Sequence, residues 1–197
     1  MKTHLLIFLF IGITFSCVGQ ESIPNPELQI KNAVLAAPEE LRGEAMVYGF
    51  NGDGELVMLR EGINDMVCIA DDPSRKGFSA SCYHRDLEPF MQRGRDLKKE
   101  GKSTQEIFDM RENEVKAGDL NMPEDPATLY VLSAPEERYN AENGEVTEPD
   151  FRYVVYIPYA TAASTGLPLS PEAPGMPWIM DPGTHRAHIM INPPKKE

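Results

Sequence analysis

The stretch AMVYGFNGDGELVMLR, residues 45–60, decides the fold class. Its two halves, residues 45–50 and 55–60, are rich in Val, Tyr, Leu and Met, a composition typical of strands. Between the halves, residues 51–54 read Asn-Gly-Asp-Gly, and these residues accept the positive φ angles of a tight turn. The stretch therefore predicts a β-hairpin.

Further strands are predicted on the C-terminal side of this hairpin. Residues 65–70 predict a third strand that continues the hairpin as a meander. Two apolar, β-branched and aromatic runs, residues 128–133 and 151–159, predict a pair of strands joined by a long acidic loop. Residues 185–191 predict the last strand, after a Pro-rich segment, residues 160–183, in which regular structure is limited to a turn.

Helical periodicity occurs in two places. Residues 27–37 carry apolar side chains at helical spacing and predict a first helix. Residues 84–118 predict two amphipathic helices that are broken at Gly101, with Ser103 and Glu106 spaced as a capping box. The order of elements predicts an α+β fold, a mainly antiparallel sheet with two or three helices packed on it.

The charge of the chain excludes some partners. The 197 residues carry 31 acidic and 19 basic side chains, a formal net charge of −12. A surface of this sign repels the phosphates of nucleic acids and anionic lipid headgroups. We therefore expect no nucleic-acid partner, and contact with a membrane only through a lipid anchor.

The N-terminus predicts export. Lys2 precedes an apolar run, residues 5–15, that is too short to span a bilayer and is typical of a signal peptide. Residues 14–17, Thr-Phe-Ser-Cys, resemble the motif that precedes the lipidated cysteine of bacterial lipoproteins. The signal is residues 1–16 if Cys17 is lipidated, and residues 1–19 if the chain is cut before Gln20.

The rest of the chain is expected to be a linker, residues 20–26, and a single globular domain, residues 27–194. Its location is extracytoplasmic: an outer-membrane or periplasmic lipoprotein, or otherwise a secreted protein. Cys68 and Cys82, 14 residues apart, are predicted to form a disulfide in such an oxidising compartment.

Three histidines raise the possibility of a metal site. His84, His185 and His188 offer the imidazole ligands that zinc and copper prefer. On a strand, however, His185 and His188 point to opposite faces. No cofactor is expected, with zinc or copper as the alternative.

The Pro-rich segment offers a place for a ligand. Trp178, the one tryptophan, lies there, and a ring on a rigid loop is a common way to hold a sugar or another ligand with an apolar face. Tyr159 and His185 are expected to complete this binding site. The alternative reading is that Trp178 anchors the loop to the core.

Hydrolysis is a further alternative. Cys82 is a candidate nucleophile, with His84 or His185 as its base and Asp86 as the orienting acid. A carboxylate pair is the other candidate, and it would come from a set of acidic residues in predicted loops: Asp71, Asp72, Glu136, Glu137, Glu145, Glu148 and Asp150.

Several short motifs carry a family resemblance. Residues 59–64, Leu-Arg-Glu-Gly-Ile-Asn, lead to Cys68 and then Cys82, and the chain closes with Trp178, Gly183, His185, His188 and Met190. This pattern resembles a group of uncharacterised secreted bacterial proteins. The resemblance implies an extracytoplasmic single domain and assigns no catalytic residue. The sequence thus favours an exported, envelope-associated accessory or ligand-binding protein that performs no chemistry, with an unknown ligand or envelope component as its partner.

Overall fold

The computed structural model describes residues 23–195, and one mixed sheet organises them. The predicted signal peptide and Cys17 lie outside this range. The sheet has eight strands in the order β2-β1-β3-β4-β5-β8-β10-β9. Their bounds are β1 Met46–Phe50, β2 Leu56–Arg60, β3 Met66–Ile69, β4 Phe78–His84, β5 Ala127–Ala134, β8 Asp150–Tyr156, β9 Trp178–Met180 and β10 His188–Ile191.

The predicted class, α+β, is confirmed. The sheet, however, is mixed, and the fold contains more helices than the two or three expected. The described residues form four α-helices: α1 Pro26–Ala33, α2 Glu88–Lys99, α3 Thr104–Ala117 and the single turn α4 Ala162–Thr165. Short 3₁₀ turns accompany them: η1 Val34–Ala36, η2 Glu39–Leu41, η3 Arg85–Leu87 and η4 Glu136–Arg138. A separate two-stranded hairpin, β6 Tyr139–Asn140 and β7 Glu145–Val146, lies within the predicted long acidic loop.

The hairpin of β1 and β2 is confirmed, but the meander is wrong. β3 pairs with β1 in parallel, on the edge opposite β2. After β2 the chain returns to the start of β1, and it crosses there because Gly62 has no side chain: a Cβ on Gly62 would lie 2.2 Å from the backbone nitrogen of Met46. Ile63 fixes the crossing by donating its backbone N–H to the carbonyl of Glu44.

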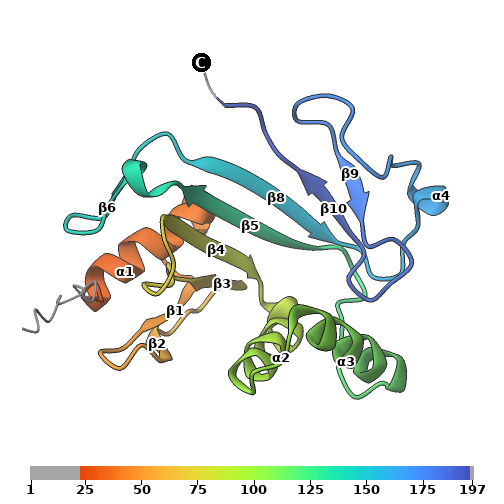
Figure 1. Cartoon of the computed structure of the whole chain (residues 1–197), viewed down its shortest axis with the longest axis horizontal. Helices are drawn as coiled ribbons and strands as arrows, with labels where there is room; N and C mark the ends of the chain where they lie inside the picture. The colour runs from red at the N-terminus through yellow and green to blue at the C-terminus, as the bar shows by residue number, and fades with distance from the viewer. Residues whose placement is uncertain (1–22, 196–197) are drawn as a thin grey trace, which may run out of the picture.

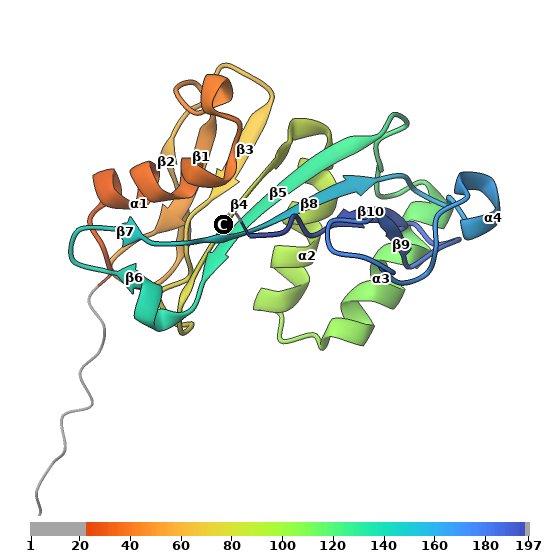
Figure 2. The ribbon, with the colours of Figure 1, turned by 90° about the horizontal axis from the view of Figure 1, so that it is seen from above.

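The two faces of the sheet are covered by different helices (Figures 1 and 2). α1 and η1 pack on the β1–β4 end, where Ala33 and Ala36 allow close approach. The same cluster contains the disulfide between Cys68 and Cys82, which are direct partners across β3 and β4. Its formation confirms the predicted pairing.

α2 and α3 lie under the middle of the sheet, on the opposite face from α1 (Figure 1). Phe90 of α2 packs with Val67 and Tyr83 of the sheet. α3 begins at the predicted capping box of Ser103 and Glu106, after a break at Gly101 whose φ is +81°. Within residues 23–195, no helix has the length and apolar character needed to cross a bilayer.

Candidate functional site

A cavity of about 750 Å³ lies between the sheet and α2, at the β1–β4 end. Its floor includes Tyr48, Ile69 and Ser81, which are cross-strand neighbours on β1, β3 and β4 and therefore share one face. The next row of the same face, with Val67 and Tyr83, is buried under α2. The cavity, called the α2 groove below, is thus the part of this face that α2 leaves open.

One wall of the α2 groove carries a fixed guanidinium. Arg95 of α2 donates to the Tyr83 hydroxyl at 2.8 Å and to a carboxylate oxygen of Glu88 at 2.6 Å. It also lies over the ring of Tyr48, 5.6 Å from the centroid. Burial raises the pKa of Tyr83, so its hydroxyl stays protonated. These partners hold Arg95 in one position beside the floor.

The other notable group is Asp71, which follows β3 and is half-buried. One of its oxygens accepts the backbone N–H of Ser79 at 2.8 Å. Within residues 23–195 it forms no salt bridge, and burial raises its pKa to about 7. Asp71 therefore lines the groove as a carboxyl group that forms no salt bridge with the described residues.

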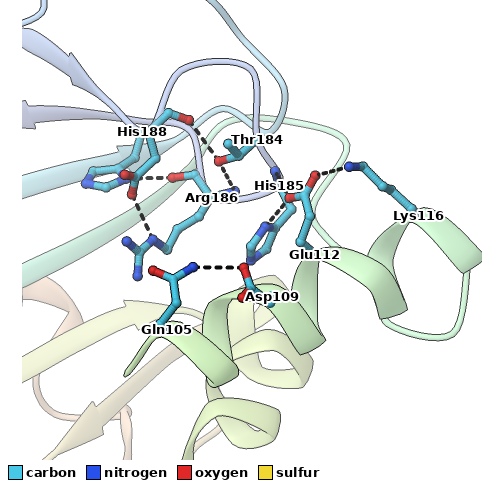
Figure 3. Close-up of polar contacts among 9 residues, drawn as sticks. Gln105, Asp109, Glu112, Lys116, Thr184, His185, Arg186 and His188 are labelled. Carbon is cyan, nitrogen blue, oxygen red and sulfur yellow. Dashed lines mark hydrogen bonds and ion pairs between the residues drawn. The ribbon is translucent and has the colours of Figure 1, made fainter. Parts of the chain in front are cut away.

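A second polar cluster lies where α3 meets the loop before β10 (Figure 3). One oxygen of Glu112 accepts the backbone N–H of His185 at 2.8 Å and also bonds its ring Nδ1. Lys116, one turn further along α3, lies 2.7 Å from the other oxygen. Phe90 and Phe108 flank the imidazole, with centroids 5.5 and 5.0 Å away.

This second cluster is structural. His185 has 0% of its surface exposed, and burial lowers its pKa although Glu112 opposes the shift. The neutral ring donates Nδ1–H to Glu112, and Nε2 has no partner among the described residues. Because no substrate reaches a ring enclosed in this way, the cluster serves to fasten the loop to α3.

The three candidate metal ligands are not brought together. His84, at the end of β4, accepts the backbone N–H of Asp86, whereas His188 lies on β10 and bonds the carbonyl oxygen of Arg186. Two strands, β5 and β8, separate β4 from β10. Over residues 23–195 the structure contains no group of three His, Cys, Asp or Glu side chains suited to hold a metal ion. Zinc or copper binding stays a prediction.

The three residues predicted to bind a ligand, Trp178, Tyr159 and His185, differ in burial. Trp178 is half-buried on the edge strand β9, and it packs with Val154 and Met190. Tyr159 is exposed, with a φ of +62°, and its backbone N–H bonds the carbonyl of Thr184. His185 is enclosed, as described above. The ring of Trp178 therefore anchors its strand to the core.

The hydrolase candidates find little support in the geometry. The sulfur of Cys82 is engaged in the disulfide, so the nucleophile that His84 or His185 would activate is not free. The seven acidic candidates are spread over loops, turns and strand ends on both sides of the sheet; Asp150, for example, pairs with Lys195 at the start of β8. Of these acids, Asp71 and Asp72 line the α2 groove.

Tyr48, Ser81 and Arg95 were not among the residues expected to form a site. Each comes from a different element, and nothing in their local sequence relates one to another. No family model, curated protein or solved structure shows significant similarity to this chain.

Proposed function

We propose that the protein is an exported, envelope-associated binding protein whose α2 groove holds a saccharide. The observation that carries the proposal is the lining of this one cavity. It combines an aromatic ring, Tyr48, with a hydroxyl, Ser81, a fixed guanidinium, Arg95, and a carboxyl acceptor, Asp71. Its volume of about 750 Å³ is in the range of small-molecule sites.

Saccharide chemistry matches this lining. A sugar ring has an apolar face that packs on an aromatic side chain, and its hydroxyls both donate and accept hydrogen bonds. Asp71 accepts from hydroxyls, and Arg95 donates to ring or carboxylate oxygens. The rim carries both signs of charge, Lys98 and Lys99 together with Glu55 and Asp96, so the lining accommodates both neutral and acidic saccharides.

Export is the second half of the proposal. The Cys68–Cys82 disulfide is compatible with an oxidising compartment, because such bonds are rare where thiols are kept reduced. A lipid on Cys17 is the proposed attachment to the membrane.

The test is calorimetric titration of the purified protein, with its disulfide intact, against neutral and acidic mono- to trisaccharides. Ser81→Phe places a ring on the floor of the groove and keeps Arg95 and its partners Tyr83 and Glu88 in the chain. Thr128→Phe is the control, since Thr128 faces the other side of the sheet from Leu129 and Val131. We expect one-site binding that Ser81→Phe weakens at least about tenfold, or by about 1.4 kcal/mol, and that Thr128→Phe leaves unchanged. The proposal fails if no saccharide binds, or if Ser81→Phe binds as well as the parent protein.

A further inference from the structure

A smaller cavity of about 220 Å³ lies between α1 and the loop that joins β3 to β4. Leu28 and Asn32 of α1 form one side, and Phe78 and Tyr139 form another, with ring centroids 4.9 Å apart. Asp71 belongs to its wall as well as to that of the α2 groove. We call it the α1 cavity.

Asn32, one of the residues that line the α1 cavity, carries an unpartnered acceptor. Asn32 is 3% exposed, and among residues 23–195 its Oδ1 has no hydrogen-bond donor. The side-chain amide of Gln29, one turn earlier on α1, is by comparison fully hydrogen-bonded. It donates to the carbonyl oxygens of Pro24 and Phe50, and it accepts the backbone N–H of Phe50. A buried acceptor without a donor is costly, so the oxygen of Asn32 is a position where a ligand gains a hydrogen bond.

Asp71 supplies to the same cavity a carboxyl group that forms no salt bridge with another described residue. This group accepts the backbone N–H of Ser79, and the charge of Arg75 acts on it without forming a salt bridge. An amide oxygen that lacks a donor and a carboxylate that lacks an ion pair among the described residues favour a group with several donors and a positive charge. A primary ammonium, with three N–H donors, is the compact group of this kind.

The mouth of the α1 cavity carries cationic side chains, in contrast to the acceptors inside it. Arg75 and Lys76 line it and are exposed, and the contact from Lys76 to Glu136 is loose, with 3.9 Å between nitrogen and oxygen. Cationic side chains at the mouth favour an anionic group on the part of the ligand nearer solvent. The rings of Phe78 and Tyr139 leave an apolar wall between the two ends.

We propose that the α1 cavity binds a free amino acid, with its ammonium on Asn32 and Asp71 and its carboxylate toward Arg75 and Lys76. The volume suits a ligand of this size. The two cavities share Asp71, Arg75 and Lys76, but Asn32 lines the α1 cavity alone and Ser81 lines the α2 groove alone, so substitutions of these two residues separate this proposal from the saccharide proposal.

The charge of Asp71 adds a pH signature. Burial raises its pKa to about 7, with Asp72 adding to the rise and Arg75 opposing it. An ammonium binds the ionised carboxylate better than the neutral acid. Amino-acid affinity is therefore expected to rise from pH 6 to pH 8, and Asp71→Asn should abolish that rise. The other charged groups that line the cavity are Lys76 and Glu136.

The test is titration of the protein with the individual standard amino acids, each at up to about 10 mM, a range that reaches weak millimolar binding. The matched probe for each binder is its α-hydroxy acid, which keeps the carboxylate and lacks the ammonium. Asn32→Leu removes the acceptor at similar volume, and Ser81→Phe is the control. We expect one amino acid or a chemical class of them to bind, with at least about tenfold weaker binding in Asn32→Leu and an unchanged affinity in Ser81→Phe.

Three results would overturn the proposal: no amino acid binds, the α-hydroxy acid binds equally well, or Asn32→Leu retains full affinity. Should Asn32→Leu fail to fold, the exposed pair Arg75→Gln and Lys76→Gln replaces it, and an unchanged affinity there has the same meaning. Because these two residues also line the α2 groove, a loss of affinity in the pair supports the α1 cavity only if Ser81→Phe leaves the amino-acid affinity unchanged. Loss of saccharide binding in Ser81→Phe with amino-acid binding retained distinguishes the two proposals.

Discussion

Glu112 and His185 lie 73 residues apart in the chain, yet one oxygen of Glu112 accepts both the backbone N–H and the ring Nδ1–H of His185. The contact joins α3 to the loop before β10 and lies beneath the rings of Phe90 and Phe108. It therefore couples two parts of the fold that are distant in the sequence.

Glu112→Ala is expected to lower the free energy of unfolding by about 3 kcal/mol. The substitution leaves two N–H groups of a fully buried residue without an acceptor, and groups of this kind cost about 1–3 kcal/mol each. Urea denaturation measures the loss. Asp109→Ala, exposed on the same helix, is the control and should change stability by less than about 0.5 kcal/mol. Equal effects of the two variants would show that the contact is not stabilising.

The stability that Glu112 provides should depend on pH. Burial would raise the pKa of its carboxyl group, but the hydrogen bonds from Lys116 and His185 prevail and lower the pKa to about 2. Since this pKa is below the unfolded value, the contribution is present above about pH 4.5 and is lost as the pH falls toward 2. The difference in melting temperature between the parent protein and Glu112→Gln should shrink over this window. A constant difference would contradict the assignment.

The contribution of Asp71 to stability should depend on pH in the opposite direction to that of Glu112, and Asp71→Asn tests this. The pKa of Asp71 in the folded protein, about 7, is above the unfolded value of 3.8. Its stabilising contribution is therefore complete below pH 3.8 and is lost as the pH rises through 7. We expect Asp71→Asn to be more stable than the parent protein by about 1–2 kcal/mol at pH 8, after allowance for solvent screening, and equal to it near pH 4. Melting curves at the two pH values check this, and Asp72→Asn is the neighbouring control.

Gly62→Ala tests the crossing that makes β3 parallel to β1. The new methyl group would lie 2.2 Å from the Met46 nitrogen, so the backbone must move, and we expect a loss of about 3 kcal/mol or more. Gly43→Ala is the matched control, because nothing lies within 4 Å of a Cβ there. If both variants unfold at the same denaturant concentration, the close approach at Gly62 does not constrain the fold.

Removal of the disulfide by Cys68→Ala with Cys82→Ala should destabilise the protein by about 3 kcal/mol, from the entropy of a loop of this length. For a chain of this size, the loss corresponds to a fall of about 6–12 °C in melting temperature. A reductant should lower the melting temperature of the parent protein and leave that of the double variant unchanged. A parent protein that is insensitive to a reductant even when unfolded would show that the bond is absent.

The sequence predicted those elements whose signals are local. The turn of residues 51–54, the capping box at Ser103 and the break at Gly101 each act within a few residues, and each is confirmed. β4 was missed although Phe78, Ala80 and Cys82 alternate with Ser79 and Ser81, because most of these side chains are small and the buried Tyr83 ends the alternation. β9 was missed because its three residues lie between prolines.

The order of the strands and the site could not be predicted in the same way. The parallel pairing of β1 and β3 depends on Gly62 passing the backbone of Met46, which is a contact between distant residues. The α2 groove likewise exists because α2 covers Val67 and Tyr83 but not the adjacent row. Neither fact leaves a pattern in the local sequence.

The position of Trp178 decides what fluorescence can report. This one tryptophan lies on β9, at the opposite edge of the sheet from β2, and its ring packs in the core. Its emission is therefore a probe of the C-terminal edge, while the α2 groove and the α1 cavity lie at the other end. If Trp178 fluorescence and the reduction of Cys68–Cys82 follow the same denaturation curve, the two ends of the sheet unfold as one cooperative unit. Separate curves would reveal two independently melting halves within a single continuous sheet.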